Sequence, residues 1–154
     1  MAPGMTATAP RVTLAGDGFA LSAPAPRAGE RIEAPGRGPR ALLAAPCLEH
    51  RPSAAPAAFA RAAAARRPDL SLIALSADDD AVRARWCRHA GWRPGRCPPE
   101  AAARLGIWLP RLQLFAPALL VIDAAGRLCH AEIVRDLAAE VDFDAALAAL
   151  AGLA

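Results

Sequence analysis

The residues with the most distinctive chemistry in this chain are its four cysteines, Cys47, Cys87, Cys97 and Cys129. A cysteine thiolate can attack an electrophile, join a disulfide or bind a metal ion, and its surroundings decide which of these it does. Disulfide scaffolds are typical of small secreted proteins, and the first residues of this 154-residue sequence do not resemble a secretion signal. We therefore expect the cysteines to be catalytic, redox-active or simply buried.

Cys47 is the first candidate nucleophile. It follows Pro46 at the end of an apolar run, in a segment that also contains His50 and Arg51. A neighbouring cation lowers the pKa of a thiol, so this position could supply a reactive thiolate. A small thiol at the end of a strand is explained equally well as a buried apolar side chain. The sequence leaves both interpretations open.

Metal binding is disfavoured by the spacing of the cysteines and histidines. Cys87 and His89 are separated by one residue, and Cys129 and His130 are adjacent, whereas zinc ligands usually come in pairs spaced by two to four residues. Neighbouring residues on a strand point to opposite faces, so the second pair could hardly share one ion. We expect no metal and no other cofactor.

The hydrophobic pattern predicts alternating strands and helices. Runs of apolar residues typical of core strands lie at 40–45, 70–75, 118–123 and 127–134. Helical composition and capping residues favour helices at 53–67, 78–89, 98–105 and 142–153. A short hairpin is expected at 11–21, after a flexible N-terminus at 1–10.

This order of elements predicts the fold. Strand, helix, strand, helix, hairpin and final helix is the thioredoxin-like order. We therefore predict an α/β protein with one thioredoxin-like domain over residues 11–154, in which a central mixed sheet of about five strands is flanked by helices on both faces.

Composition restricts the class of protein. Hydrophobic residues make up 55% of the chain and the mean hydropathy is +0.22, but no run approaches the roughly 18 apolar residues of a spanning helix. The 18 basic residues are all arginine, and they are scattered among 15 acidic residues rather than clustered as in nucleic-acid binding proteins. We expect a cytoplasmic protein that binds neither membrane nor nucleic acid.

Three segments resemble the atypical two-cysteine thiol peroxidases, a branch of the peroxiredoxins. Segment 76–91 is similar to the resolving-cysteine helix of that family, with Cys87 at the resolving position. Segment 118–147 looks like the family's C-terminal hairpin and last helix, and the N-terminal hairpin with 28–30 gives a weaker match. The matching residues of the first segment are Ser76-Ala77-Asp78, Arg85-Trp86-Cys87 and Gly91. The resemblance implies the peroxiredoxin type of thioredoxin-like fold.

The resemblance also implies where the active site should be. The family uses a proline, a threonine, the attacking (peroxidatic) cysteine and an arginine. Pro46 matches the proline, but His50 stands at the threonine position and Pro117 at the arginine position. Ser53, 34 residues before Cys87, stands where the attacking cysteine is expected. A serine hydroxyl is barely ionised at neutral pH and forms no disulfide, so we predict reduced or lost activity.

Three hypotheses follow for function. An active protein would, as the resemblance implies, reduce hydrogen peroxide or alkyl hydroperoxides with electrons from thioredoxin, and would form a homodimer; Cys47 and Cys87 would then have to supply the chemistry. The chain could instead be a non-catalytic binding or regulatory module of the same fold. It could also run another thiol–disulfide reaction from Cys47. Fold analogy alone does not choose among them.

Overall fold

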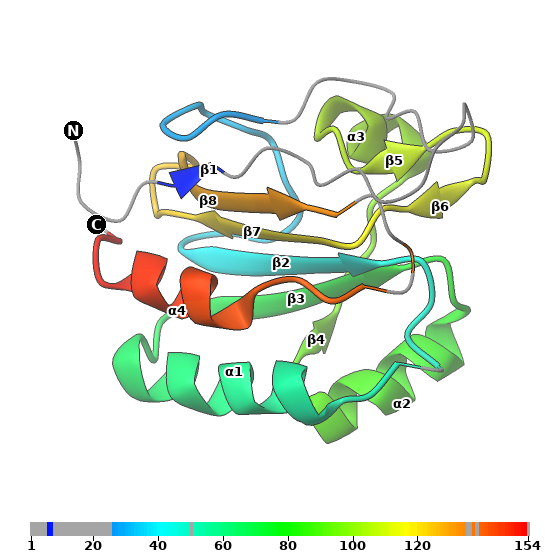
Figure 1. Ribbon diagram of the computed structural model, residues 1–154, viewed down its shortest axis with the longest axis horizontal. Coiled ribbons are helices and arrows are strands. Elements are labelled where there is room, and N and C mark those ends of the chain that lie inside the picture. Colours follow the sequence, from blue (N-terminus) through cyan, green and yellow to red (C-terminus); the bar gives the residue numbers. More distant parts are fainter. Residues whose placement is uncertain (1–5, 8–25, 50, 135–136, 138, 154) are drawn as a thin grey trace.

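A six-stranded sheet lies between two layers of helices (Figure 1). The computed structural model describes residues 6–7, 26–49, 51–134, 137 and 139–153. The strands of the sheet are β1 (Thr6–Ala7), β2 (Arg40–Ala45), β3 (Ser71–Ser76), β4 (Arg93–Pro94), β7 (Ala118–Ile122) and β8 (Leu128–Ile133). A separate hairpin consists of β5 (Trp108–Leu109) and β6 (Leu114–Phe115). The helices are α1 (Ala54–Arg66), α2 (Asp80–Ala90), α3 (Pro99–Arg104) and α4 (Phe143–Leu150).

The sheet is mixed, as predicted. Its strand order is β1-β8-β7-β2-β3-β4. β2 runs parallel to β3 and antiparallel to β7, and β7 and β8 form the expected antiparallel hairpin. All six residues of β2 are buried, because helices or loops cover both faces of this central strand. The loop that follows β2 therefore begins at the end of a central strand, between β7 and β3.

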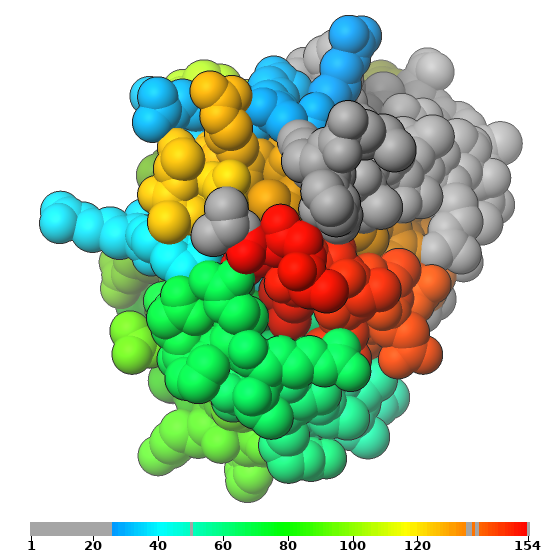
Figure 2. Space-filling view, turned by 90° about the vertical axis from the view of Figure 1, so that its left-hand side faces the viewer, coloured from blue at the N-terminus to red at the C-terminus, as the bar shows by residue number. Residues whose placement is uncertain are grey.

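Each face of the sheet has its own apolar core. The side chains of α1, α2 and α4 pack on one face, where the rings of Phe59, Trp92 and Phe143 meet. α3 and the β5–β6 hairpin cover the other face, where the rings of Trp108 and Phe115 meet edge to face. Figure 2 shows α1 in green and α4 in orange-red, lying side by side on the first face. Among the described residues, no helix is long and apolar enough to span a bilayer.

The start of α2 differs from the prediction. We expected a helix from Asp78, but the helix begins at Asp80 and the Asp79 side chain caps it by accepting a hydrogen bond from the Val82 N–H at 3.0 Å. Three consecutive aspartates are equally good caps by sequence, and Asp78 is used elsewhere. The predicted stop is confirmed, because Gly91 adopts the left-handed conformation with φ of 76°.

Part of the predicted N-terminus lies outside the described residues. Within the segment 1–10, Thr6 and Ala7 pair with β8 in a parallel register. The hairpin expected at 11–21 is not among the residues that the structure describes. The stretch after it contributes one isolated bridge, between Arg31 and Arg127, rather than a full strand.

Arg40 anchors the loop that precedes β2, and replacing it should destabilise the fold. It is only 6% exposed, and its guanidinium donates to the backbone carbonyls of Pro35, Gly38 and Ala34. Arg40→Lys keeps the charge but cannot reproduce this fork of donors. We expect the free energy of unfolding, measured by urea denaturation, to fall by about 2–4 kcal/mol. The matched change at exposed Arg37 should have no measurable effect, and an equal loss at both positions would contradict this role.

His130 should make the fold sensitive to mild acid. It is 1% exposed on β8, and burial lowers its pKa, although the charges of Glu132 and Asp142 oppose that effect. The folded state therefore takes up the proton less readily than the unfolded chain, whose histidine has a pKa of about 6.5. Stability should be full above that value and decline as the pH falls towards the lowered folded pKa.

Urea denaturation between mildly alkaline and mildly acidic pH tests this dependence on His130. The stability of His130→Gln should vary less with pH than that of the wild type, by up to one proton taken up on unfolding. Exposed His89→Gln is the control and should follow the wild-type curve. An unchanged slope in His130→Gln would show that other groups cause any acid sensitivity.

Candidate active site

The loop that joins β2 to α1 holds most of the predicted site residues. Pro46 directly follows β2, and Ser53 is the N-cap residue that immediately precedes α1. The Ser53 side chain makes no capping hydrogen bond, although its carbonyl accepts the Ala57 N–H at 2.9 Å. The hydroxyl thus lies at the positive end of the helix dipole, the kind of position that stabilises a thiolate. The N-terminus of α1 is suited to an anion, but a serine hydroxyl at this position stays protonated.

Cys47 lies beside a carboxylate. Its Sγ lies 3.3 Å from the Oδ1 of Asp78, to which the thiol can donate a hydrogen bond. The other oxygen of the same carboxylate accepts the Leu48 N–H at 2.7 Å. The described contacts of Cys47 therefore include an acid, whereas Arg51, the neighbouring cation in the sequence, donates to backbone carbonyls near α4.

Asp78 is held in its charged form by these contacts. Burial by itself would raise its pKa, but hydrogen bonds from Leu48, Ser76 and Cys47, together with the charge of Arg83, lower the pKa below its ordinary value. A carboxylate with a lowered pKa is a weak base, so Asp78 is a poor acceptor for the Cys47 proton.

Cys87 lies in the last turns of α2 and faces the interior. It is 1% exposed, and burial raises its pKa to about 11, despite the nearby positive charge of Arg83. All four cysteines lie within the described residues, and all four are free thiols. A buried thiol that is almost entirely protonated at neutral pH cannot attack an oxidised partner unless α2 moves or unwinds.

Arg51 contacts the segment before α4 instead of the Cys47 thiol. Its guanidinium donates to the carbonyl of Ala139 at 3.0 Å and to that of Leu137. Sequence reasoning considered it only as a neighbour of Cys47. His50, expected at the threonine position, is not among the described residues.

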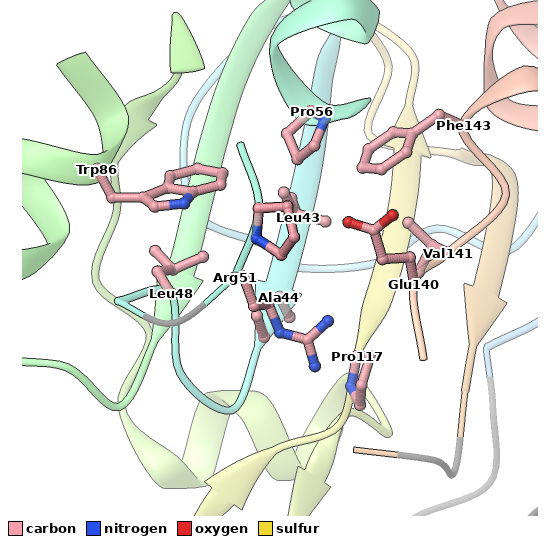
Figure 3. A pocket seen from close by; sticks show the side chains of 12 residues that line it. Leu43, Ala44, Leu48, Arg51, Pro56, Trp86, Pro117, Glu140, Val141 and Phe143 are labelled. Atoms are coloured by element: carbon pink, nitrogen blue, oxygen red, sulfur yellow. The ribbon is translucent and has the colours of Figure 1, made fainter. Parts of the chain in front are cut away.

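A small cavity adjoins this loop and brings several of the predicted positions together (Figure 3). Arg51 and Pro117 both line it, with Trp86 of α2 on another side. Its volume of about 20 Å³ has room for little more than one water molecule. The remaining lining residues are mostly apolar: Leu43, Ala44, Ala45, Leu48, Pro52, Pro56, Glu140, Val141 and Phe143.

This arrangement offers limited chemistry. Pro117 has no donor to aim at the cavity, and the Arg51 guanidinium is engaged with backbone carbonyls. No sulfur lines the cavity, since neither Cys47 nor Cys87 is among its walls. The sequence did not reveal the contact of Cys47 with Asp78 or that of Arg51 with Ala139, because the two residues of each pair are distant in the chain. Nothing in the local pattern could have revealed them.

Comparisons with known proteins agree with this fold. No family model and no curated protein matches the sequence. The structure of a peroxiredoxin-like protein from Aquifex aeolicus superposes with a TM-score of 0.71 at 15% identity, over 85% of this chain and 90% of that chain. Thiol peroxidase from Chromobacterium violaceum gives a TM-score of 0.62 at 18% identity, over 79% and 83%.

Peroxidoxin BcpB from Mycobacterium tuberculosis gives a TM-score of 0.59 at 18% identity, over 80% of this chain and 96% of that chain. Identities this low support the fold but not the activity of those proteins. The chain therefore has the thioredoxin-like α/β fold in the form found in peroxiredoxins and thiol peroxidases.

Proposed function

We propose that this chain is a peroxiredoxin-like protein whose peroxide turnover is reduced or lost. The observation that carries the proposal is the serine at the start of α1. Ser53 occupies the end of the helix dipole that would favour an anionic sulfur, and its hydroxyl stays protonated there. The helix N-terminus that would stabilise a thiolate is present, but the residue at that position has no sulfur.

Peroxide reduction by a thiol requires two steps that Ser53 cannot perform. A thiolate attacks one peroxide oxygen, the O–O bond breaks, and the products are a sulfenic acid and an alcohol or water. A second thiol then displaces water to form a disulfide, which a dithiol donor such as thioredoxin would reduce. An alcohol oxygen gives neither the sulfenic acid nor the disulfide.

The remaining thiols are poorly placed to replace it. Cys47 donates to the Asp78 carboxylate, and Cys87 is buried with a raised pKa. These two observations favour a non-catalytic binding or regulatory module over a redox reaction routed through Cys47 and Cys87. The same resemblance supports two partners as part of this proposal. They are a second copy of the chain, in a homodimer, and thioredoxin.

Peroxide consumption should separate these possibilities. We expect the reduced wild-type protein, supplied with thioredoxin and its reductase, to consume hydrogen peroxide at the rate of the same mixture without the protein. Cys47→Ser should leave that rate unchanged. A wild-type rate well above background that disappears in Cys47→Ser would overturn the proposal and identify Cys47 as the nucleophile.

Ser53→Cys tests whether the N-terminus of α1 can activate a thiol placed at residue 53. We expect the new thiol to be oxidised by peroxide faster than Cys47, because the start of α1 stabilises a thiolate by up to about 1 kcal/mol. Turnover should stay far below that of a complete site, since Pro117 supplies no charge to the departing oxygen. Mass spectrometry of each cysteine peptide after a peroxide pulse measures this, and Ala54→Cys in the same turn is the matched control.

Asp78 should restrain the reactivity of Cys47. Replacing it with asparagine removes the carboxylate charge 3.3 Å from the sulfur while keeping an oxygen that can accept the Leu48 N–H. We expect the alkylation rate of Cys47 by iodoacetamide at neutral pH to rise by about tenfold, allowing for partial solvent screening.

The matched control for Asp78→Asn is Glu49→Gln. Glu49 lies in the same loop but pairs with Arg85 at 3.7 Å, so its loss should leave the alkylation of Cys47 unchanged. Equal rates in Asp78→Asn and wild type, with circular dichroism showing both folded, would mean that the carboxylate does not control this thiol.

A further inference from the structure

A second cavity is lined by residues of β3, α2 and the segment after β4. It has a volume of about 290 Å³ and opens at the end of β3, where α2 begins. Its walls include Ser76, Asp80, Arg83, Arg96 and Phe115. It shares no lining residue with the small cavity beside Arg51, and its apolar walls belong to the core cluster on the α3 face. The two cavities are therefore separate, although Arg83 of the second also contacts the Asp78 carbonyl.

Two guanidinium groups from different elements meet on one carboxylate at this cavity. Arg83 of α2 donates to Oδ1 of Asp80 at 2.5 Å, and Arg96, in the segment after β4, donates to Oδ2. Each oxygen of the carboxylate thus has one arginine. Such charge-assisted pairs are the usual means of recognising carboxylates, so the two donors are already spaced for that group.

Of the two arginines, Arg83 is fixed, whereas the Arg96 side chain is 79% exposed. Arg83 is 7% exposed, and its Nη1 is anchored by the carbonyls of Ser76 at 3.2 Å and Asp78 at 2.7 Å. Its Nε is buried and has no hydrogen-bond partner among the described residues. The Asp80 side chain is 65% exposed. The pair of Asp80 with Arg96 is exposed on both sides and contributes little stability, and the exposed aspartate can reach solvent when another carboxylate takes its place on Arg83.

The walls away from the arginines suit an apolar group. Leu75 and Phe115 belong to the buried core cluster of this face and line the same cavity. A ligand with a carboxylate at one end and a compact apolar body would meet both surfaces. A bare phosphate ion would use the arginines but leave the apolar wall uncovered.

We propose that this cavity binds a small organic carboxylate, which replaces the Asp80 side chain between Arg83 and Arg96. Asp80 then acts as an internal competitor that keeps the two arginines neutralised when no ligand is bound. Because it is tethered beside the arginines, it lowers the apparent affinity of any ligand that has to displace it.

Titration with phenylacetate, followed by nuclear magnetic resonance of the backbone amides, tests the proposal. We expect saturable shifts of the Ser76, Gly95 and Arg96 amides at millimolar phenylacetate. The neutral isostere 2-phenylacetamide should bind at least about tenfold more weakly, because it offers no charge to the arginines. Equal shifts with both compounds, or binding of inorganic phosphate as tight as that of phenylacetate, would overturn the assignment.

Two variants separate the carboxylate site from non-specific attraction to arginine. Asp80→Asn removes the competitor and should tighten phenylacetate binding by about tenfold, whereas Glu100→Gln, which removes an acid from the first turn of α3, should not. Arg96→Ala should abolish saturable shifts, and Arg93→Ala, which changes an exposed arginine outside the cavity, should not. Unchanged or weaker binding in Asp80→Asn would refute the competitor role and the proposal with it.

Discussion

The carboxylate of Asp78 fixes the loop on which every interpretation of this site depends. It accepts the Leu48 N–H at 2.7 Å and the Cys47 thiol at 3.3 Å, and so ties the exit of β2 to the segment before α2. On the other side, Arg51 binds the carbonyl of Ala139 and holds the same loop to the segment before α4. A loop held at both sides delivers the start of α1 in one position. Such fixed positioning is what a binding or catalytic site requires of its loops.

Burial makes three of the four thiols harder to ionise. Burial raises the pKa of Cys87 and of Cys97 to about 11, and it also raises that of Cys129. At neutral pH a thiol with a pKa near 11 is a thiolate in only about one molecule in ten thousand. Cys47 is more exposed, and its sulfur lies beside the Asp78 carboxylate. All four cysteines are free thiols in this fold, which is consistent with the proposal that Ser53 stands at the nucleophile position.

The elements of this fold were largely predictable because their signals are local. β2 has the predicted bounds, since five apolar residues follow Arg40 and run up to Pro46, and Gly91 ends α2 by the left-handed conformation that glycine favours. The contacts of the site were not predictable. Cys47 and Asp78 are 31 residues apart and Arg51 and Ala139 are 88 apart, so only the folded chain brings them together. The resemblance predicts that Ser53 stands at the position of the attacking cysteine, but it could not show what surrounds Cys47.

The two cavities differ in size and in how their arginines are held. The one beside Arg51 is small and mostly apolar, and its arginine is already engaged with backbone carbonyls. The one at the end of β3 is larger and more open, and its two arginines are held by an exposed side chain that solvent can take up. The two cavities share no lining residue, so a substitution in the walls of one leaves the walls of the other in place. The second lies at the carboxyl end of β3, and open α/β sheets commonly bind their ligands at the carboxyl ends of their strands.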